Sequence, residues 1–110
     1  MAMKMARVIL FTRQIDTMSA FYAEVLGLKR VTNESTWREF DAGGVRLALH
    51  SGPPSPGAKG PKIAFYAKDV AAMRTALVAR GARFGKVRPG EFCLCDGKDP
   101  DGNPIQLSNR

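Results

Sequence analysis

The sequence of 110 residues repeats itself, and this internal duplication limits the possible folds more than any other feature. Arg7–Phe11, in the strand-like run Arg7–Thr12, aligns with Lys62–Tyr66 at an offset of 55 residues. Toward the end of each copy, Gly44–Leu49 corresponds to Gly102–Leu107. A unit of this size cannot bury its hydrophobic face alone, so repeated units pack against one another. The duplication predicts a single domain of two modules, module one at about residues 5–50 and module two at about residues 62–110.

Module one is predicted to fold as a strand, a helix and three further strands, which is a βαβββ unit. The helix begins near Ile15, because Met18, Phe21 and Val25 recur at the spacing of one buried helix stripe. Asp16 suits an N-cap or a first-turn acid, and Gly27 suits the position just after the helix. The strands of module one are expected at four segments: Arg7–Thr12, Leu28–Val31, Thr36–Phe40 and Val45–His50.

Module two repeats this order after a connection rich in proline and glycine. Ser51–Pro61 is predicted to be a surface linker, because proline removes backbone donors and glycine loosens the chain. Asp69 is the expected N-cap of the second helix, and Gly81 its end. The buried stripe of this helix is expected at Val70, Met73 and Leu77. The strands are expected at Lys62–Tyr66, Ala82–Val87, Glu91–Cys95 and Pro104–Ser108. The predicted fold class is α+β.

Charge and cysteine content narrow the function classes. The formal charge is +7, but the basic residues are scattered, with no run longer than Lys29-Arg30 and no recognition-helix or aromatic-platform motif. We therefore expect no nucleic-acid partner. No apolar stretch approaches the length of a membrane span, so no membrane partner is expected either. Two cysteines are too few for a disulfide framework and fit a reducing compartment, which predicts a cytoplasmic protein.

Two motifs, spaced around the duplication, carry a family resemblance. Val8–Phe11 followed by Phe21–Leu28, with its Phe-Tyr and Leu-Gly-Leu strings, resembles the opening module of the vicinal oxygen chelate superfamily. Asp99–Pro104, ahead of Ile105–Leu107, resembles the turn into its final strand. This superfamily contains glyoxalase I, bleomycin-resistance proteins and extradiol dioxygenases. The resemblance implies that the two modules form a cup-shaped site and that the protein is a homodimer.

The resemblance also implies where metal-dependent members hold their metal. The four ligand positions, usually His, Gln or Glu, fall on Arg7, Ala48, Lys62 and Gln106. The two cations would repel a divalent metal, alanine has no donor atom, and one glutamine oxygen does not hold a transition metal. His50 is the only histidine, which excludes a site built from two imidazoles of one chain. We therefore expect neither a divalent metal nor another cofactor.

At two of these positions the metal ligand is replaced by a cation. Arg7 and Lys62 would stand near the floor of the cup, and a buried cation needs a partner. A carboxylate or phosphate of a ligand is one such partner, gripped bidentately by arginine. The alternatives are an internal salt bridge, to Glu39 or Glu91, or simple exposure at the strand start. The predicted ligand-binding residues are Arg7, Ile9, Phe11, Ala48, His50, Lys62, Tyr66 and Gln106.

Four further side chains carry possible chemistry. His50 lies two residues after Ala48 on one strand and faces the same side, so it is a candidate general base or hydrogen-bonding group. The alternative is a half-exposed histidine at a strand end. Tyr66 is the second candidate acid–base group. Cys93 and Cys95 share a face, either as small buried hydrophobes or with one of them as a nucleophile or adduct site.

These residues favour a metal-independent protein that binds a small, partly apolar, neutral or anionic molecule. The alternative is a lyase, isomerase or dioxygenase-type enzyme of the same superfamily, with or without a divalent metal. Bleomycin itself is a poor candidate ligand, because it is cationic and a chain of charge +7 repels it. The sequence leaves open whether the ligand is turned over.

Overall fold

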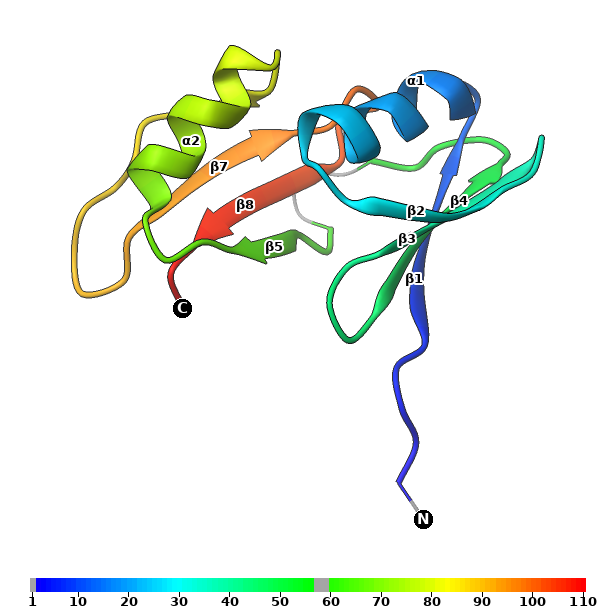
Figure 1. Ribbon diagram of the computed structural model, residues 1–110, viewed down its shortest axis with the longest axis horizontal. Coiled ribbons are helices and arrows are strands. Elements are labelled where there is room, and N and C mark those ends of the chain that lie inside the picture. The colour runs from blue at the N-terminus through cyan, green and yellow to red at the C-terminus, as the bar shows by residue number, and fades with distance from the viewer. Residues whose placement is uncertain (1, 57–59) are drawn as a thin grey trace. The chain divides into compact units, whose positions relative to one another are not determined.

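A computed structural model describes residues 2–56 and 60–110, and its backbone divides into two compact units. Unit 1 is Met1–Ser55 and unit 2 is Pro56–Arg110. The boundary falls inside the segment predicted as a linker, of which residues 57–59 lie outside the described residues. Each unit contains one four-stranded sheet and one helical segment (Figure 1). The predicted α+β class, with two βαβββ modules, is confirmed.

Unit 1 contains six elements: β1 (Arg7–Thr12), α1 (Ile15–Ala20), the π-helical segment η1 (Phe21–Val25), β2 (Lys29–Asn33), β3 (Trp37–Asp41) and β4 (Arg46–Ser51). The strand order is β1-β4-β3-β2, with β1 parallel to β4 and the other pairs antiparallel. Gly43 and Gly44 make the turn between β3 and β4, and both have a positive φ that favours glycine. Sequence patterns placed these strands within two residues of their observed ends.

The helical segment of unit 1 begins without a side-chain cap. Its N-cap is Gln14, and Asp16 lies in the first turn, so Asp16 is the first-turn acid and not the N-cap. α1 continues directly into η1, and Met18, Phe21 and Tyr22 are buried. Sequence periodicity predicted Met18 and Phe21 in this stripe but not Tyr22, and the third predicted member, Val25, is only half-buried. The stripe holds the segment against β3 and β4.

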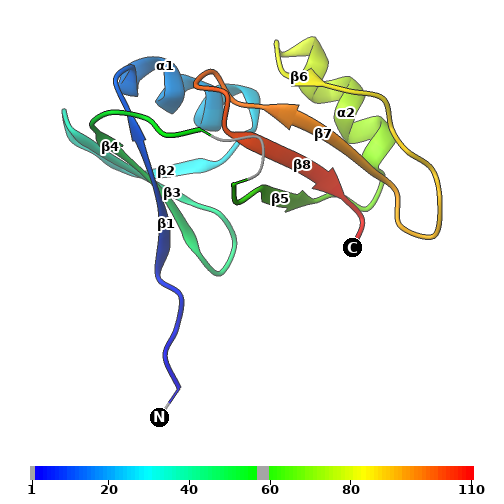
Figure 2. The ribbon, with the colours of Figure 1, turned by 180° about the vertical axis from the view of Figure 1, so that it is seen from behind.

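Unit 2 repeats the arrangement with five elements: β5 (Ile63–Tyr66), α2 (Val70–Ala79), β6 (Arg83–Phe84), β7 (Leu94–Lys98) and β8 (Pro104–Ser108). The strand order is β5-β8-β7-β6, with β5 parallel to β8. The first strand of each unit is therefore an edge strand that pairs in parallel with the last. Figure 2 shows the same order from behind.

The second helix begins as predicted and buries a narrower stripe than predicted. The carboxylate of Asp69 accepts a hydrogen bond from the backbone nitrogen of Ala72 at 3.0 Å, which is an N-cap bond. Val70 and Leu77 are buried, but Met73 is exposed, so its assignment to the buried stripe is wrong. A helix turns about 100° per residue, which places Met73 about 60° to one side of Val70.

The two middle strands of unit 2 differ from their predicted bounds. The strand expected at Ala82–Val87 is reduced to β6 (Arg83–Phe84), and the one expected at Glu91–Cys95 lies three residues later as β7. Pro89 and Gly90 separate them, and only one isolated bridge, Arg88 with Leu94, pairs this stretch. Proline lacks a backbone donor, and Gly90 has a φ of +151°, so a regular ladder cannot run through here.

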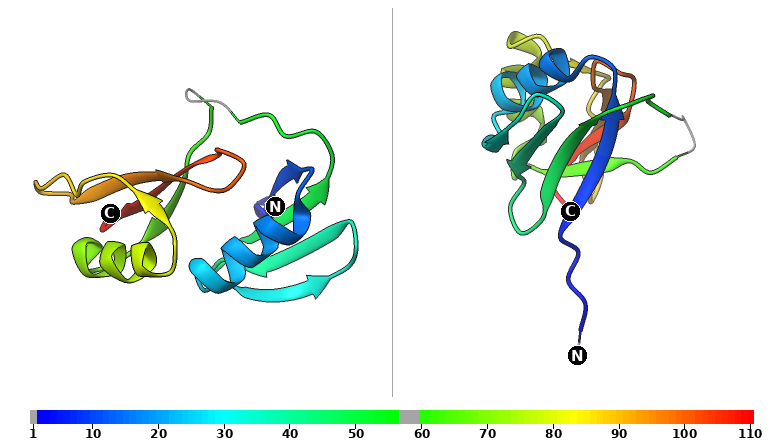
Figure 3. Two further views of the ribbon diagram at one scale, coloured as in Figure 1. Left: turned by 90° about the horizontal axis from the view of Figure 1, so that it is seen from above. Right: turned by 90° about the vertical axis from the view of Figure 1, so that its right-hand side faces the viewer.

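Each helix covers one face of its own sheet and leaves the other face without a helix (Figure 3). The covered face holds the apolar core of the unit. In unit 1 the buried strand residues of the core are Phe40, Leu47 and Leu49. In unit 2 they are Phe84, Cys95, Ile105 and Leu107. Because side chains alternate along a strand, the residues between these point to the helix-free face.

Candidate functional site

Strand register brings all the predicted residues of unit 1 to its helix-free face. Across β1 and β4 the paired residues are Arg7 with Arg46, Ile9 with Ala48, and Phe11 with His50. Paired neighbours point to the same side of a sheet. The adjoining strand β3 adds two residues that sequence analysis did not assign to the site: Trp37 pairs with His50, and Glu39 pairs with Ala48.

One half of this face is a charged group that we call the Glu39 cluster, formed by Arg7, Glu39 and Arg46. Glu39 Oε1 accepts a hydrogen bond from Arg7 Nε at 2.8 Å, and Glu39 Oε2 lies 3.5 Å from an Arg46 nitrogen. The Glu39 side chain is only 8% exposed, whereas both arginines are partly exposed. The hydrogen bond from Arg7 lowers the pKa of Glu39, against the opposing effect of burial. Of the alternatives for Arg7, the salt bridge to Glu39 is the one observed.

The other half is an aromatic group that we call the aromatic cluster, formed by Phe11, Trp37 and His50. The His50 ring centre lies 5.4 Å from that of Phe11 and 5.5 Å from that of Trp37, which it meets edge to face. Phe11 is 48% exposed and the neighbouring Ile9 is 42% exposed. Large apolar side chains left open beside charged groups are typical of small-molecule sites.

Ala48 lies between the two clusters and is fully buried, although it belongs to the helix-free face. Its methyl group is small, and its paired neighbours in the sheet are the longer side chains of Ile9 and Glu39. Ala48 therefore adds no polar group to the centre of the face, and its neighbours cover it.

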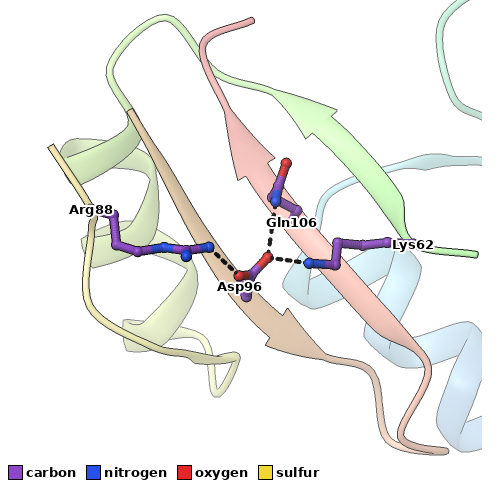
Figure 4. Close-up of polar contacts among 4 residues, drawn as sticks. All are labelled: Lys62, Arg88, Asp96 and Gln106. Atoms are coloured by element: carbon purple, nitrogen blue, oxygen red, sulfur yellow. Dashed lines mark hydrogen bonds and ion pairs between the residues drawn. The ribbon is translucent and has the colours of Figure 1, made fainter. Parts of the chain in front are cut away.

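Unit 2 has a charged group at the corresponding place, which we call the Asp96 cluster (Figure 4). Asp96 Oδ1 accepts hydrogen bonds from Lys62 Nζ at 2.9 Å and from Gln106 Nε2 at 3.0 Å. Asp96 Oδ2 accepts from an Arg88 nitrogen at 2.6 Å. The bond from Gln106 contributes most to lowering the pKa of Asp96, and Lys62 and Arg88 add to it. Burial opposes this shift.

The Asp96 cluster corrects the predicted partner of Lys62. Lys62 does form an internal salt bridge, but to Asp96 and not to Glu91, which is exposed and outside the strands. The predicted strand ended at Cys95, so the next residue was treated as loop. Tyr66, at the end of β5, is 68% exposed and pairs in register with Ser108. Lys62 and Gln106 are thus brought together in unit 2, while Tyr66 lies two strand positions from Gln106.

The two charged clusters are copies of one arrangement. In each unit a cation from the start of the first strand binds a carboxylate on the third strand, Glu39 or Asp96. Each carboxylate pairs in register with a last-strand residue, Ala48 or Gln106. Glu39 and Asp96 are 57 residues apart, close to the offset of the duplication. Neither alignment finds this pair in the sequence, because the first strands align at an offset of 55 residues and the last strands at 58.

The cysteines lie in different surroundings. Cys95 is fully buried on the helix-covered side, and burial raises the pKa of its thiol. A thiol with a raised pKa is a weak nucleophile, so Cys95 fits a small core residue. Cys93 is half-buried, and its Sγ lies 3.8 Å from the backbone oxygen of Gly90. Both are free thiols.

None of the predicted ligand-binding residues lines the three hollows on the surface, although Asp96 lines the first and Arg46 the third. One of about 490 Å³ in unit 2 is lined by Arg74, Arg83, Lys98 and the apolar Val78 and Phe84 among others. A second in unit 2 measures about 550 Å³, and one in unit 1 about 450 Å³.

Among the helices of residues 2–56 and 60–110, none has the length and apolar character that crossing a bilayer requires.

Residues 4–107 match the family model described as the Glyoxalase/Bleomycin resistance protein/Dioxygenase superfamily. A comparison with curated proteins finds no match.

Several solved structures share the fold at low sequence identity. A lactoylglutathione lyase from Agrobacterium tumefaciens is 22% identical, with a TM-score of 0.77 over 98% of this chain and 94% of that one. A glyoxalase/bleomycin resistance protein/dioxygenase family enzyme from Burkholderia phytofirmans PsJN is 19% identical, with a TM-score of 0.80 over 96% and 98%. A glyoxalase/bleomycin resistance protein/dioxygenase from Nocardioides is 17% identical, with a TM-score of 0.81 over 98% and 83%. At these identities the likeness shows the fold alone.

Proposed function

The chain belongs to the glyoxalase/bleomycin resistance protein/dioxygenase superfamily, and from this premise we propose that it is a metal-independent binder of a small molecule. The proposed ligand is partly apolar and neutral or anionic. It lies on the helix-free face of unit 1, against the aromatic cluster and the Glu39 cluster. Lys62, Tyr66 and Gln106 are proposed as ligand-binding residues on the corresponding face of unit 2.

The observation that carries this proposal is the exposure of Ile9 and Phe11 directly beside charged groups. Burying apolar surface is worth about 25 cal/mol per Å², so an apolar ligand part that covers these side chains gains affinity. The Glu39 cluster holds two guanidinium groups and one carboxylate, which leaves one positive charge in excess. That excess favours a neutral or anionic polar group on the ligand.

The residues at the family's metal positions support a binder without a divalent metal. Arg7 and Lys62 are cations already held by carboxylates, and Ala48 has no donor atom. Gln106 uses its amide nitrogen on Asp96, which leaves one neutral oxygen. A divalent ion needs several anionic or imidazole ligands, so these side chains do not fit one.

A thermal-shift screen of acidic and aromatic metabolites tests the proposal. We expect a ligand to raise the melting temperature of the native chain and to raise that of Arg7→Ala and Lys62→Ala less. Each variant is compared with its own ligand-free melting temperature, because both substitutions also break an ion pair. Lys86→Ala is the matched control, since it removes one exposed positive charge that lies outside the strands and that no described salt bridge uses. A ligand whose effect is the same in all four proteins would contradict binding at these cations.

A second candidate function is an enzyme that uses His50 or Tyr66 as an acid–base group. The observation that favours it is their accessibility: His50 is half-buried beside open aromatic rings, and Tyr66 is largely exposed. A lyase or dioxygenase of the metal-dependent kind would carry a tightly bound metal. Stoichiometric nickel, zinc or iron that survives dialysis of the purified protein would replace the binder proposal with this one.

We also propose that the protein acts as a homodimer in the cytoplasm. The family implies the dimer. The two cysteines support the location, because both are free thiols and a bridge between residues two apart on a strand would be strained.

A further inference from the structure

We propose that the aromatic cluster of unit 1 binds a planar ring that carries a hydrogen-bond donor, with His50 Nε2 as the acceptor. This acceptor and the excess positive charge of the Glu39 cluster together indicate that the ligand is a hydroxyaryl acid. The inference rests on the proposed function and specifies the ligand of that site.

The first step is the protonation of the His50 ring. His50 Nδ1 lies 2.9 Å from the backbone oxygen of Ser51. A carbonyl oxygen can only accept, so Nδ1 carries the proton of this hydrogen bond. In the neutral ring the lone pair is therefore on Nε2. Among residues 2–56 and 60–110, no group donates a hydrogen bond to Nε2.

The second step is the surroundings of that acceptor. The His50 ring stands between two aromatic rings, tilted by 39° to Phe11 and by 88° to Trp37. Phe11 is nearly half exposed, so its ring offers open surface next to the acceptor. Aromatic rings pack well against one another in tilted and edge-to-face arrangements. A planar ring on Phe11 would place a ring substituent within reach of His50.

The third step is the distance to the positive charge. Phe11 and Ile9 are two residues apart on β1, and Ile9, Ala48 and Glu39 form one row across the sheet. The Glu39 cluster is therefore about 7 Å along the strands from the aromatic cluster. Arg7 binds Glu39 through Nε, and among the described residues its two terminal nitrogens make no hydrogen bond. A carboxylate separated from a phenol ring by a short chain spans this distance.

Trp37 is the only tryptophan and His50 the only histidine. Fluorescence of Trp37 therefore reports ligand binding at the aromatic cluster, and NMR signals of His50 report where its ring proton lies. Binding of 3-(4-hydroxyphenyl)propanoate and of 3-phenylpropanoate is measured by Trp37 fluorescence. The two probes differ only in the hydroxyl group. We expect the hydroxyl to strengthen binding about fivefold, the factor that one ordinary hydrogen bond confers.

Two variants separate the hydrogen bond from packing. His50→Phe keeps an aromatic ring and removes the acceptor, so the preference for the hydroxyl should disappear. His50→Gln returns an acceptor oxygen near the place of Nε2, so part of the preference should return. Lys98→Ala, in unit 2, should keep the full preference.

Nitrogen NMR of the free protein tests the first step without a ligand, since one imidazole gives one set of signals. We expect neutral His50 to carry its proton on Nδ1. A neutral ring protonated on Nε2 would overturn the inference, as would a hydroxyl preference that His50→Phe leaves unchanged. If acidic ligands bind but the hydroxyl has no effect, the inference fails and the proposed function stands. If neither probe binds and the thermal-shift screen finds no ligand, both fail.

Discussion

Glu39 is the residue of unit 1 on which most of the charged contacts converge. It is nearly buried, it pairs with Arg7 and Arg46, and its backbone nitrogen donates to Thr32 Oγ1 at 2.9 Å. A buried carboxylate is costly unless it is hydrogen-bonded, and here the partners are charged. Asp96 has as many partners but is 40% exposed, so water screens its contacts.

Replacing Glu39 with glutamine should therefore destabilise the protein more than replacing Asp96 with asparagine. We expect Glu39→Gln to lower the free energy of unfolding by about 1.5 kcal/mol, because Arg7 and Arg46 lose their counter-charge. Asp96→Asn should lower it less, because of solvent screening. Urea unfolding at neutral pH measures both. A larger loss of unfolding free energy for Asp96→Asn would show that burial does not decide which carboxylate stabilises the protein more.

The same carboxylates predict a loss of stability in acid. The pKa values of Glu39 and Asp96 are lowered in the folded protein, so the unfolded chain takes up protons first as the pH falls. Their stabilising contribution is present above the pKa of the unfolded groups, about 4, and is lost as the pH falls through the lower folded values. Urea unfolding between pH 7 and pH 3 should show a shallower acid decline in Glu39→Gln than in the native chain. Equal declines in the native chain and in Glu39→Gln would contradict a contribution of Glu39 to the loss of stability in acid.

At the scale of elements, β6 and β7 are the pair most dependent on a single residue. β6 has two residues, and its ladder consists of Arg83 with Lys98 and Phe84 with Gly97. A side chain at Gly97 would meet the backbone oxygen of Arg83 and would lie 2.6 Å from the Phe84 ring. Glycine at this position allows the close approach of the two strands.

Gly97→Ala should consequently cost about 2 kcal/mol, since it forces β6 away from β7. Gly85→Ala is the matched control, because the nearest atom to its added carbon is the Asp96 backbone oxygen at an ordinary 3.6 Å. Its effect should stay within about 0.5 kcal/mol. Thermal or urea unfolding of the two variants measures the difference. If Gly97→Ala and Gly85→Ala change the free energy of unfolding equally, the close approach of β6 to β7 does not require glycine at position 97.

At the scale of the whole molecule, the duplication yields two units that share one arrangement of a cation bound to a strand carboxylate. The other side chains on the two helix-free faces differ. Unit 1 adds the aromatic cluster, and unit 2 holds the larger share of positive charge. Residues 1–55 contain 7 basic and 5 acidic residues, and residues 56–110 contain 10 and 5. Arg7, Arg46, Lys62 and Arg88 are the cations bound to the two cluster carboxylates.

The proposed homodimer is tested directly on the whole chain. Light scattering of the purified protein at micromolar concentration should give twice the mass of one chain. The physical reason is that a second copy would cover apolar side chains that a single chain leaves exposed. A single-chain mass under these conditions would contradict the dimer and would leave the binder proposal to stand on the units of one chain.

Local patterns in the sequence predicted most of the secondary structure. The helix stripe of Met18 and Phe21, the Asp69 cap and the glycine turns are all encoded within a few residues, so periodicity and turn chemistry predicted them. The βαβββ order and the family followed from the same local motifs. Met73 and the bounds of β7 were wrong, because burial and pairing there depend on what lies opposite.

Thus the sequence by itself determined the two modules, most of their elements and the cation near the start of each first strand. The tertiary structure decided which residues stand beside those cations. Glu39 and Asp96 lie 32 and 34 residues from Arg7 and Lys62 along the chain, and Trp37 meets His50 only through the pairing of β3 with β4. Such contacts arise from strand register, which depends on the whole sheet and leaves no short-range pattern in the sequence.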